Sequence, residues 1–355
     1  MFGSSSALAV LLSLALAAGA WAEELVVEDL ASRKVSVRLP VERVLGVGPG
    51  ALRLLCYLGL QDKVVGIEDL EAEGARVMGR PYRMASPELG GRPVFGKGGP
   101  NPSPDLERMA SLSPQAIFLV GDPGLADSIQ GKLGVPVLVL SYGGFGFADE
   151  PLWRSLRLVG EVMGVRERAE GLISYAKGLM DDLRRRGESV PEGARPSVYA
   201  GGISSRGGHG ISMTSYPFPP LDLLGARNVA AGAGRRGTFA VDVEKLFEWD
   251  PEVVFLDVGN LELVKADLAK FPALKGLRAF REGRVFALVQ YNFYNTNLEL
   301  ALINAYAVGK VLYPQAFADV DLPSKAGEIL RRFVGKDVYG ELLSGYGEPG
   351  RRLEL

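Results

Sequence analysis

Histidine and cysteine are nearly absent from this chain. Its 355 residues include one histidine, His209, and one cysteine, Cys56. Proteins that hold a bare transition-metal ion need several convergent imidazole, thiolate or carboxylate ligands. One histidine and one cysteine do not supply such a cluster, so we predict no protein-held metal ion and no resident cofactor. A lone cysteine also excludes an intramolecular disulfide, and Cys56 lies in an apolar helical stretch that is typical of a core residue.

An excess of charge of either sign is missing as well. Lys and Arg together number 40, Asp and Glu together number 42, and the formal net charge is −2. Proteins that bind nucleic acid carry a basic patch or stripe, so we predict no nucleic-acid partner. The chain has neither a phosphate-binding P-loop nor a G-x-S-x-G nucleophile elbow. The sequence therefore predicts a protein that is not an enzyme.

Hydrophobic runs long enough to cross a bilayer are also missing. The apolar run at residues 7–18 is too short, because a spanning helix needs about 20 apolar residues. Small residues follow it, and Ala20-Trp21-Ala22 precedes Glu23 in the A-x-A pattern of a signal-peptidase site. We predict a signal peptide over residues 1–22, cleaved after Ala22, and a periplasmic mature protein. The alternative is an uncleaved anchor, since no Lys or Arg precedes the apolar run.

Short apolar segments alternate with helical segments in two separate parts of the chain. Runs of this kind, divided by helices, predict buried strands of a parallel sheet that is covered on both faces. They lie at residues 44–47, 64–67, 116–120 and 135–140, and again at 197–200, 253–256 and 285–288. The prediction is an α/β protein with two similar lobes, each with a mostly parallel central sheet. The first lobe spans 23–150 and the second 191–355.

One long helix is predicted between these lobes, within linking helices over residues 151–190. Apolar residues recur at helical spacing from Arg166 to Arg186, and Gly187 is predicted to end the helix. Such a helix is about 30 Å long, enough to join two lobes and leave a ligand cleft between them. Other local predictions are a hairpin at residues 25–37, a helix at 272–280, and a capping box of Thr296 and Glu299 ahead of an apolar helix at 298–312.

A short pattern occurs once in each lobe. An acidic residue opens a helix, and a glutamate follows two positions later. In both lobes a proline lies seven positions after that glutamate and precedes a buried strand. A helix–proline–strand unit is common in α/β proteins, but the shared acidic start and spacing indicate related lobes. The equivalent residues are Asp105, Glu107 and Pro114 in the first lobe and Asp242, Glu244 and Pro251 in the second.

From about residue 26 to residue 338 the chain resembles the cobalamin, haem and ferric-siderophore binding proteins of ABC importers. The paired Glu-x6-Pro segments and the segment 291–314, which begins Tyr-Asn-Phe-Tyr-Asn-Thr-Asn, carry this resemblance. It implies two α/β lobes that move little relative to each other, and a monomeric receptor. It also implies that Glu107 and Glu244 dock onto arginines of a permease dimer at the inner membrane.

Candidate ligand-binding residues follow predicted strands, where a cleft between parallel sheets would lie. They are Tyr142, Arg206, His209, Tyr291 and Tyr294. Tyrosine offers a flat apolar face together with a hydrogen-bond donor, and a Gly-rich loop around Arg206 and His209 allows close backbone approach to a ligand. The competing interpretations are a mobile surface loop for 204–210, a structural histidine, and tyrosines that pack at a lobe edge.

Four further residues are weaker candidates for the same cleft. Phe145 and Lys97 fall in loops of the first lobe, and Arg235 and Arg236 could neutralise an anionic ligand, although paired arginines are usually solvated.

The function that these observations favour is an extracytoplasmic solute-binding protein that captures a metal chelate, such as an iron siderophore, haem or a corrinoid, for an ABC permease. Two alternatives stay open. A receptor for molybdate or tungstate on the same fold would need arginines and amide donors around a small cleft. An exported α/β enzyme, such as a metal chelatase, would show turnover.

Overall fold

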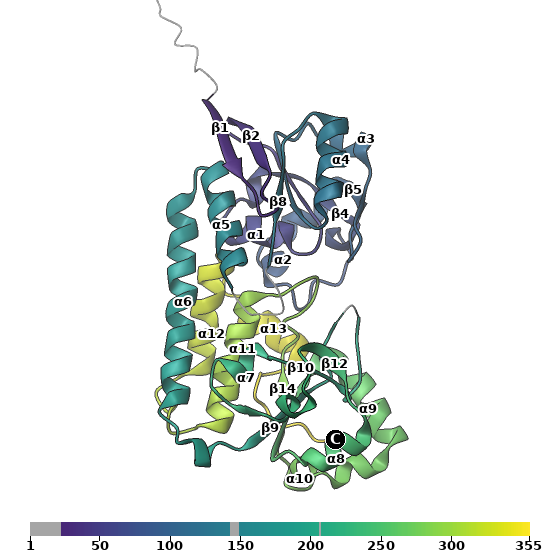
Figure 1. Ribbon diagram of the computed structural model, residues 1–355, viewed down its shortest axis with the longest axis vertical. Coiled ribbons are helices and arrows are strands. Elements are labelled where there is room, and N and C mark those ends of the chain that lie inside the picture. The colour runs from purple at the N-terminus through teal and green to yellow at the C-terminus, as the bar shows by residue number, and fades with distance from the viewer. Residues whose placement is uncertain (1–22, 143–148, 206) are drawn as a thin grey trace, which may run out of the picture.

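The computed structural model describes residues 23–142, 149–205 and 207–355. Two β-sheets lie toward opposite ends of the long axis, and a long helix runs along one side past both of them (Figure 1). The predicted α/β class with two lobes and a joining helix is confirmed. No helix in these described ranges is long and apolar enough to cross a membrane.

The described chain opens with the predicted hairpin. Strands β1 (Glu23–Glu28) and β2 (Lys34–Leu39) pair antiparallel, with Leu25 opposite Val37. Alternation places Val35 and Val37 inside and their charged neighbours outside, as a strand with one buried face requires. Arg33, at the turn, forms an ion pair with the buried Asp29 at 2.8 Å.

The N-terminal lobe is built on a six-stranded sheet. Its strands are β3 (Val44–Val47), β4 (Val64–Glu68), β5 (Val94–Lys97), β6 (Ser103–Pro104), β7 (Ala116–Val120) and β8 (Val137–Leu140), in the order β6-β5-β4-β3-β7-β8. All neighbours are parallel except β5 and β6. The helices of this lobe are α1 (Ala51–Tyr57), α2 (Pro81–Ala85), α3 (Leu106–Ser111) and α4 (Pro123–Leu133).

Two helices lead from this lobe to the other. Helix α5 (Glu150–Val162) ends at a turn in which Gly164 has φ +68°, and α6 (Arg166–Glu188) follows. The prediction that Gly187 ends α6 is wrong, because the helix includes it. Gly187 is buried, and a Cβ there would lie 2.2 Å from the carbonyl oxygen of Leu224. Its small size therefore serves close packing between elements.

The C-terminal lobe contains a smaller, all-parallel sheet. Its order is β11-β9-β13-β14, formed by β9 (Ser197–Gly201), β11 (Arg227–Asn228), β13 (Val253–Asp257) and β14 (Val285–Leu288). Strands β10 (Met213–Tyr216) and β12 (Gly237–Ala240) form a separate antiparallel pair. The helices that follow α6 are α7 (Pro219–Asp222), α8 (Val243–Trp249), α9 (Leu261–Lys270), α10 (Arg278–Arg281), α11 (Leu298–Leu312), α12 (Leu322–Val334) and α13 (Tyr339–Tyr346).

Single-turn 3₁₀ helices occupy several connections. The segment 272–280, predicted as one helix, is divided in the structure. It forms a 3₁₀ helix at Pro272–Gly276, turns at Leu277 and then forms α10. The other 3₁₀ helices are Gln61–Lys63, Asp69–Glu71, Pro87–Gly91, Glu192–Ala194, Val229–Ala233 and Val258–Asn260.

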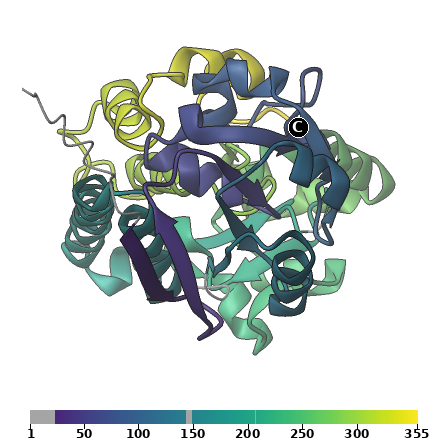
Figure 2. The ribbon, with the colours of Figure 1, turned by 90° about the horizontal axis from the view of Figure 1, so that it is seen from above.

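One hydrophobic core extends through both lobes. It includes Leu54 of α1, Leu172 of α6, Phe255 of β13 and Leu302 of α11. Helix α11 packs against α6 and α12, and these helices lie along the same side of the molecule in both views (Figures 1 and 2). Helix α12 also packs against α1 and α2. The lobes are therefore joined by shared packing as well as by covalent connection.

The repeated sequence pattern corresponds to a repeated structural unit. In the N-terminal lobe, Asp105 caps α3 and buried strand β7 follows; in the C-terminal lobe, Asp242 precedes α8 and buried strand β13 follows. The caps differ, since Asp105 accepts hydrogen bonds from the amides of Glu107 and Arg108 and Asp242 makes no side-chain cap bond.

Candidate functional site

The loops at the carboxyl ends of the N-terminal strands meet the segment that follows β14. We call this set of contacts the interlobe joint; it consists of residues 48–53, 68 and 98–99 on the N-terminal side and residues 290–297 on the other. Carboxyl ends of parallel strands are the usual place for a ligand in α/β proteins. The joint therefore lies where the sequence predicted a cleft, and its side chains define the candidate site.

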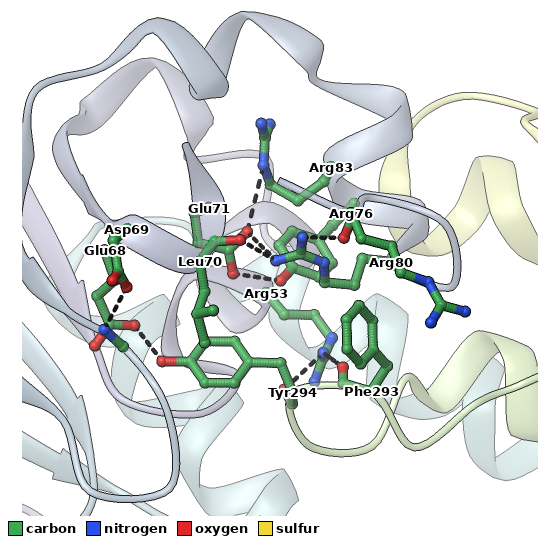
Figure 3. Close-up of polar contacts among 12 residues, drawn as sticks. Arg53, Glu68, Asp69, Leu70, Glu71, Arg76, Arg80, Arg83, Phe293 and Tyr294 are labelled. Atoms are coloured by element: carbon green, nitrogen blue, oxygen red, sulfur yellow. Dashed lines mark hydrogen bonds and ion pairs between the residues drawn. The ribbon is translucent and has the colours of Figure 1, made fainter. Parts of the chain in front are cut away.

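Arg53 is the centre of the joint (Figure 3). It belongs to α1, is fully buried, and its guanidinium donates to the carbonyl oxygens of Phe293 at 3.0 Å, Tyr294 at 2.9 Å and Thr296 at 2.9 Å. It also lies 3.3 Å from the hydroxyl of Tyr142. A planar guanidinium with five donors can bind several acceptors at once, so one residue holds the segment 293–296 against the N-terminal lobe.

Glu68 and Tyr294 form a second contact across the joint. Glu68, at the end of β4, is 3% exposed and accepts a hydrogen bond from the amide of Gly48 at 2.9 Å. Its other carboxyl oxygen accepts the hydroxyl proton of Tyr294, whose oxygen in turn accepts from the amide of Gly99 at 3.1 Å. Burial raises the pKa of Glu68 to about 7, although both hydrogen bonds that it accepts act in the opposite direction.

Guanidinium groups outnumber their acidic partners beside the joint. Arg80 and Arg83 are buried and form ion pairs with Glu71 at 2.9 Å and 3.3 Å. Arg76 is exposed, donates to Gln290 at 3.3 Å, and forms no ion pair within the described ranges. The guanidinium groups of Arg76 and Arg80 both lie over the ring of Phe293, with their central carbons 5.4 Å and 5.1 Å from the ring centroid. Figure 3 shows the two arginine side chains beside this ring.

Burial also limits the negative charge around Arg53. Glu299, the second residue of α11, is fully buried and accepts a hydrogen bond from Tyr57. That burial raises the pKa of Glu299. With the pKa values of Glu68 and Glu299 both raised, the region around Arg53 and Arg76 carries a surplus of positive charge, which favours an anionic ligand.

A buried polar network occupies the corresponding place in the C-terminal lobe. The hydroxyl of Ser204 donates to Asp257 at 3.2 Å and accepts from Asn260 and Gln290, each at 2.8 Å. The carbonyl oxygen of Ser204 accepts from Asn292 at 2.9 Å. Burial raises the pKa of Asp257 to about 7. This network ties the loop after β9 to the segment after β14.

The five candidate ligand residues have different surroundings. Tyr294 and Tyr142 are brought together at Arg53, and the hydroxyl of Tyr142 also donates to the carbonyl oxygen of Gly50 at 3.0 Å. The ring of Tyr291 packs against Phe218 with centroids 5.9 Å apart.

His209 is partly buried, and its Nε2 lies 2.8 Å from the carbonyl oxygen of Ser205. Arg206 and Phe145 lie outside the described residues. Of the weaker candidates, Lys97 is exposed at the end of β5, and Arg235 and Arg236 lie over the rings of Phe239 and Tyr216.

The predicted capping box of Thr296 and Glu299 is wrong. Asn297 occupies the N-cap position of α11 without a side-chain cap bond, and the carboxyl group of Glu299 binds Tyr57 of the N-terminal lobe instead. The hydroxyl of Tyr57 also accepts from the amide of Leu298 at 3.1 Å. A residue 241 positions away thus satisfies the helix terminus, and a tertiary contact replaces the local one.

Sequence reasoning missed Arg53, Glu68, Arg76 and Asp257. A signal existed for three of them. Arg53 interrupts an otherwise apolar helix, and Glu68 and Asp257 each end a buried strand, where an acidic side chain is buried only if it has partners. For a metal ion, no group of three or more His, Cys, Asp or Glu side chains comes together in the part of the chain that the structure describes.

The predicted docking residues are both accessible. Glu107 in the first turn of α3 and Glu244 in the first turn of α8 are exposed, and the two helices lie near opposite ends of the long axis (Figure 1).

Comparison with known proteins places these features in context. A family model described as periplasmic binding protein matches residues 48–291. The molybdate-binding protein MolA of Haemophilus influenzae is 24% identical over 328 residues, which cover 87% of this chain and 90% of that protein.

Solved structures share the fold over most of the chain. A periplasmic solute binding protein from Veillonella parvula has a TM-score of 0.71 and 20% identity, covering 91% of this chain and 97% of that one. A protein described as an ABC-type Fe3+-hydroxamate transport system from Saccharomonospora viridis has a TM-score of 0.55 and 19% identity, covering 81% and 99%.

Proposed function

Because the chain belongs to the periplasmic binding protein family, whose members are solute-binding proteins of ABC transporters and not enzymes, we propose that its solute is a compact metal-containing anion of the molybdate or tungstate class. The observation that carries this proposal is the surplus of guanidinium groups at the interlobe joint. Arg53 lies in the joint and Arg76, Arg80 and Arg83 lie beside it, and among the described residues only Glu71 forms ion pairs with any of them.

Two further features support a small anion. Arg76 is exposed beside the joint and is stacked on Phe293, so its charge is both accessible and held in place. The aromatic side chains that a large chelate would use are already engaged, since Tyr294 binds Glu68 and Tyr142 binds Gly50. The similarity to MolA, which is named a molybdate-binding protein, supports this class of solute.

A metal chelate is the second candidate, and the clustering of aromatic residues favours it. Tyr142, Phe293 and Tyr294 all lie at Arg53, and rings with polar edges suit a flat organic ligand. A chelate would also give Tyr291, His209 and Arg206 a binding role. Iron siderophores, haem and corrinoids remain the chelates to be tested.

Titration calorimetry with the mature protein distinguishes the two candidates. We expect molybdate and tungstate to bind, with sulfate, phosphate, a ferric hydroxamate and haem binding at least about tenfold more weakly, a difference of about 1.4 kcal/mol. Arg76→Gln should reduce molybdate affinity by about tenfold or more. Arg184→Gln on the exposed face of α6 is the control, because it removes an equal charge far from the joint. Tight binding of a chelate with no response to molybdate would contradict the oxyanion proposal.

The family also implies permease and ATPase components as partners and an extracytoplasmic location. We propose that Glu107 and Glu244 contact the permease, since exposed carboxylates on equivalent helices of two lobes suit a partner with two equivalent subunits. We further propose cleavage after Ala22 and release into the periplasm as a monomer. Mass spectrometry of the secreted protein should identify Glu23 as its first residue; a mature pool beginning at Met1 would contradict this.

A further inference from the structure

The segment that crosses to the N-terminal lobe depends on its contacts there. Tyr294 and Asn295 both have left-handed backbone conformations, with φ of +54° and +74°. Such conformations are unfavourable for residues other than glycine and persist only where surrounding contacts stabilise them. The stabilising contacts include Glu68 with the Tyr294 hydroxyl and the carbonyl oxygen of Pro49, which accepts from Asn295 at 3.1 Å.

Glu68 has no cationic partner among the residues that the structure describes. It forms no ion pair within the described ranges, and the groups that face it are the amide of Gly48 from the loop after β3 and the hydroxyl of Tyr294 from across the joint. The acidic Glu71 and Asp69 of its own loop also raise the pKa of Glu68. A buried carboxyl in this setting is more stable protonated than ionised.

We propose that the Glu68–Tyr294 contact is a proton-dependent link between the lobes, so that solute affinity falls as the pH rises through neutrality. The part of this inference that concerns affinity rests on the proposed anionic solute. Protonated Glu68 keeps the joint closed and adds no negative charge beside the arginines. Ionised Glu68 attracts water into the joint and places a negative charge beside the bound anion.

The direction follows from linkage. The closed joint binds the proton of Glu68 more tightly than an open one in which water reaches the carboxyl, so proton loss favours opening. By reciprocity, a bound anion raises the proton affinity of Glu68, and binding is accompanied by proton uptake. With one such group, the association constant falls by up to about tenfold for each pH unit above about 7.

The binding experiment measures molybdate affinity by calorimetry from about pH 5.5 to about pH 8.5. The wild-type affinity should decline above about pH 7, and Glu68→Gln, which resembles the protonated form, should remove most of that decline. Glu73→Gln is the matched control, because Glu73 is exposed in the following loop and should retain the decline. A wild-type affinity that does not change with pH, or a decline that persists in Glu68→Gln, would overturn the inference.

A measurement without solute separates this inference from the proposed function. Hydrogen exchange reports the opening of residues 291–297 and of the amides of Gly48 and Gly99. Relative to Glu68→Gln at the same pH, protection in the wild type should fall as the pH rises from about 4.5, the ordinary pKa of a glutamate, to about 7, and should stay low above that. Tyr294→Phe removes the hydroxyl and should show low protection throughout. Equal protection in wild type and Glu68→Gln at every pH would overturn the link itself, whereas failure of molybdate to bind, with this effect present, would contradict only the proposed solute.

Discussion

Arg53 is a single buried side chain that connects segments more than two hundred positions apart. Its carbonyl partners at Phe293, Tyr294 and Thr296 lie 240 to 243 residues later in the chain. Desolvating a guanidinium is expensive unless its donors are satisfied. Here three carbonyl oxygens and one hydroxyl accept from the two terminal nitrogens of Arg53, whereas its buried Nε has no hydrogen-bond partner among the described residues. Arg53 therefore stabilises the joint through the placement of its donors, and its positive charge adds to the positive potential of the site.

Replacement of Arg53 by Lys tests this geometric role. Lysine keeps the charge but cannot spread its donors over the three carbonyl oxygens of the segment 293–296. We expect Arg53→Lys to lower the free energy of unfolding by about 2–3 kcal/mol, because buried carbonyl oxygens lose their partners. Urea denaturation measures the change. An exposed guanidinium offers the control, and Arg185→Lys on α6 should change stability by less than about 0.5 kcal/mol; a similar small effect at Arg53 would contradict the role.

Asp257 predicts a pH dependence of stability with a definite sign. Burial raises its pKa from 3.8 unfolded to about 7 folded, so the folded protein retains a proton that the unfolded chain loses. Its contribution is complete below about pH 4 and is lost as the pH rises to about 7, a decrease of up to about 4 kcal/mol. Asp257→Asn should flatten this part of the profile in denaturation experiments. The exposed Asp62→Asn should leave it unchanged; a steep decline in both variants would assign it to other groups.

At the scale of elements, the two copies of the repeated helix–strand unit differ in their N-cap hydrogen bonds. Asp105 and Asp242 occupy the same N-cap position, and each helix leads to a buried strand. Only Asp105 accepts amide hydrogen bonds from the first turn of its helix, at 3.1 Å. Stability is therefore expected to depend unequally on two residues that the sequence makes equivalent.

Matched substitutions measure this difference. Asp105→Ala removes a cap that satisfies two amides and should cost about 0.5–2 kcal/mol of unfolding free energy. Asp242→Ala removes no side-chain cap bond and should cost less than about 0.5 kcal/mol. Thermal or urea unfolding of the two variants gives the comparison. Equal losses would mean that the caps contribute equally in solution.

At the scale of the molecule, a shared core limits how the lobes can move. Buried residues of α1, α6, α11 and β13 belong to one continuous cluster, and α12 packs against helices of the N-terminal lobe. We therefore expect any opening of the joint to be a small rotation about this packed side. Glu107 is on α3 and Glu244 is on α8, and these helices lie near opposite ends of the molecule (Figure 1). We expect their separation to be nearly fixed.

That fixed separation underlies a docking prediction. The double variant Glu107→Ala, Glu244→Ala removes two exposed carboxylates that make no ion pair in the described ranges, so folding and solute affinity should change little. Uptake in cells and binding to the reconstituted permease should be strongly reduced. As a control, Glu167→Ala and Glu188→Ala on α6 remove the same charge from another face. Normal transport by the first variant would contradict the docking role.

Much of the fold was determined by the sequence alone. Strands at 44–47, 116–120 and 285–288 match the prediction residue for residue, because continuous apolar runs between helices have few alternatives to a buried strand. The hairpin, the long helix and the buried Cys56 follow from equally local patterns. The predicted lobe boundaries, ligand contacts and docking residues remain predictions.

Tertiary structure decided the rest, above all which polar residues meet at the joint. Glu68 and Tyr294 are 226 positions apart, and Tyr57 replaces Thr296 as the partner of Glu299. Periodicity and capping rules describe interactions within a few residues of each other. The burial of a charged group, its pKa and its hydrogen-bond partners depend instead on which distant segments share its surroundings, and folding alone brings those segments together.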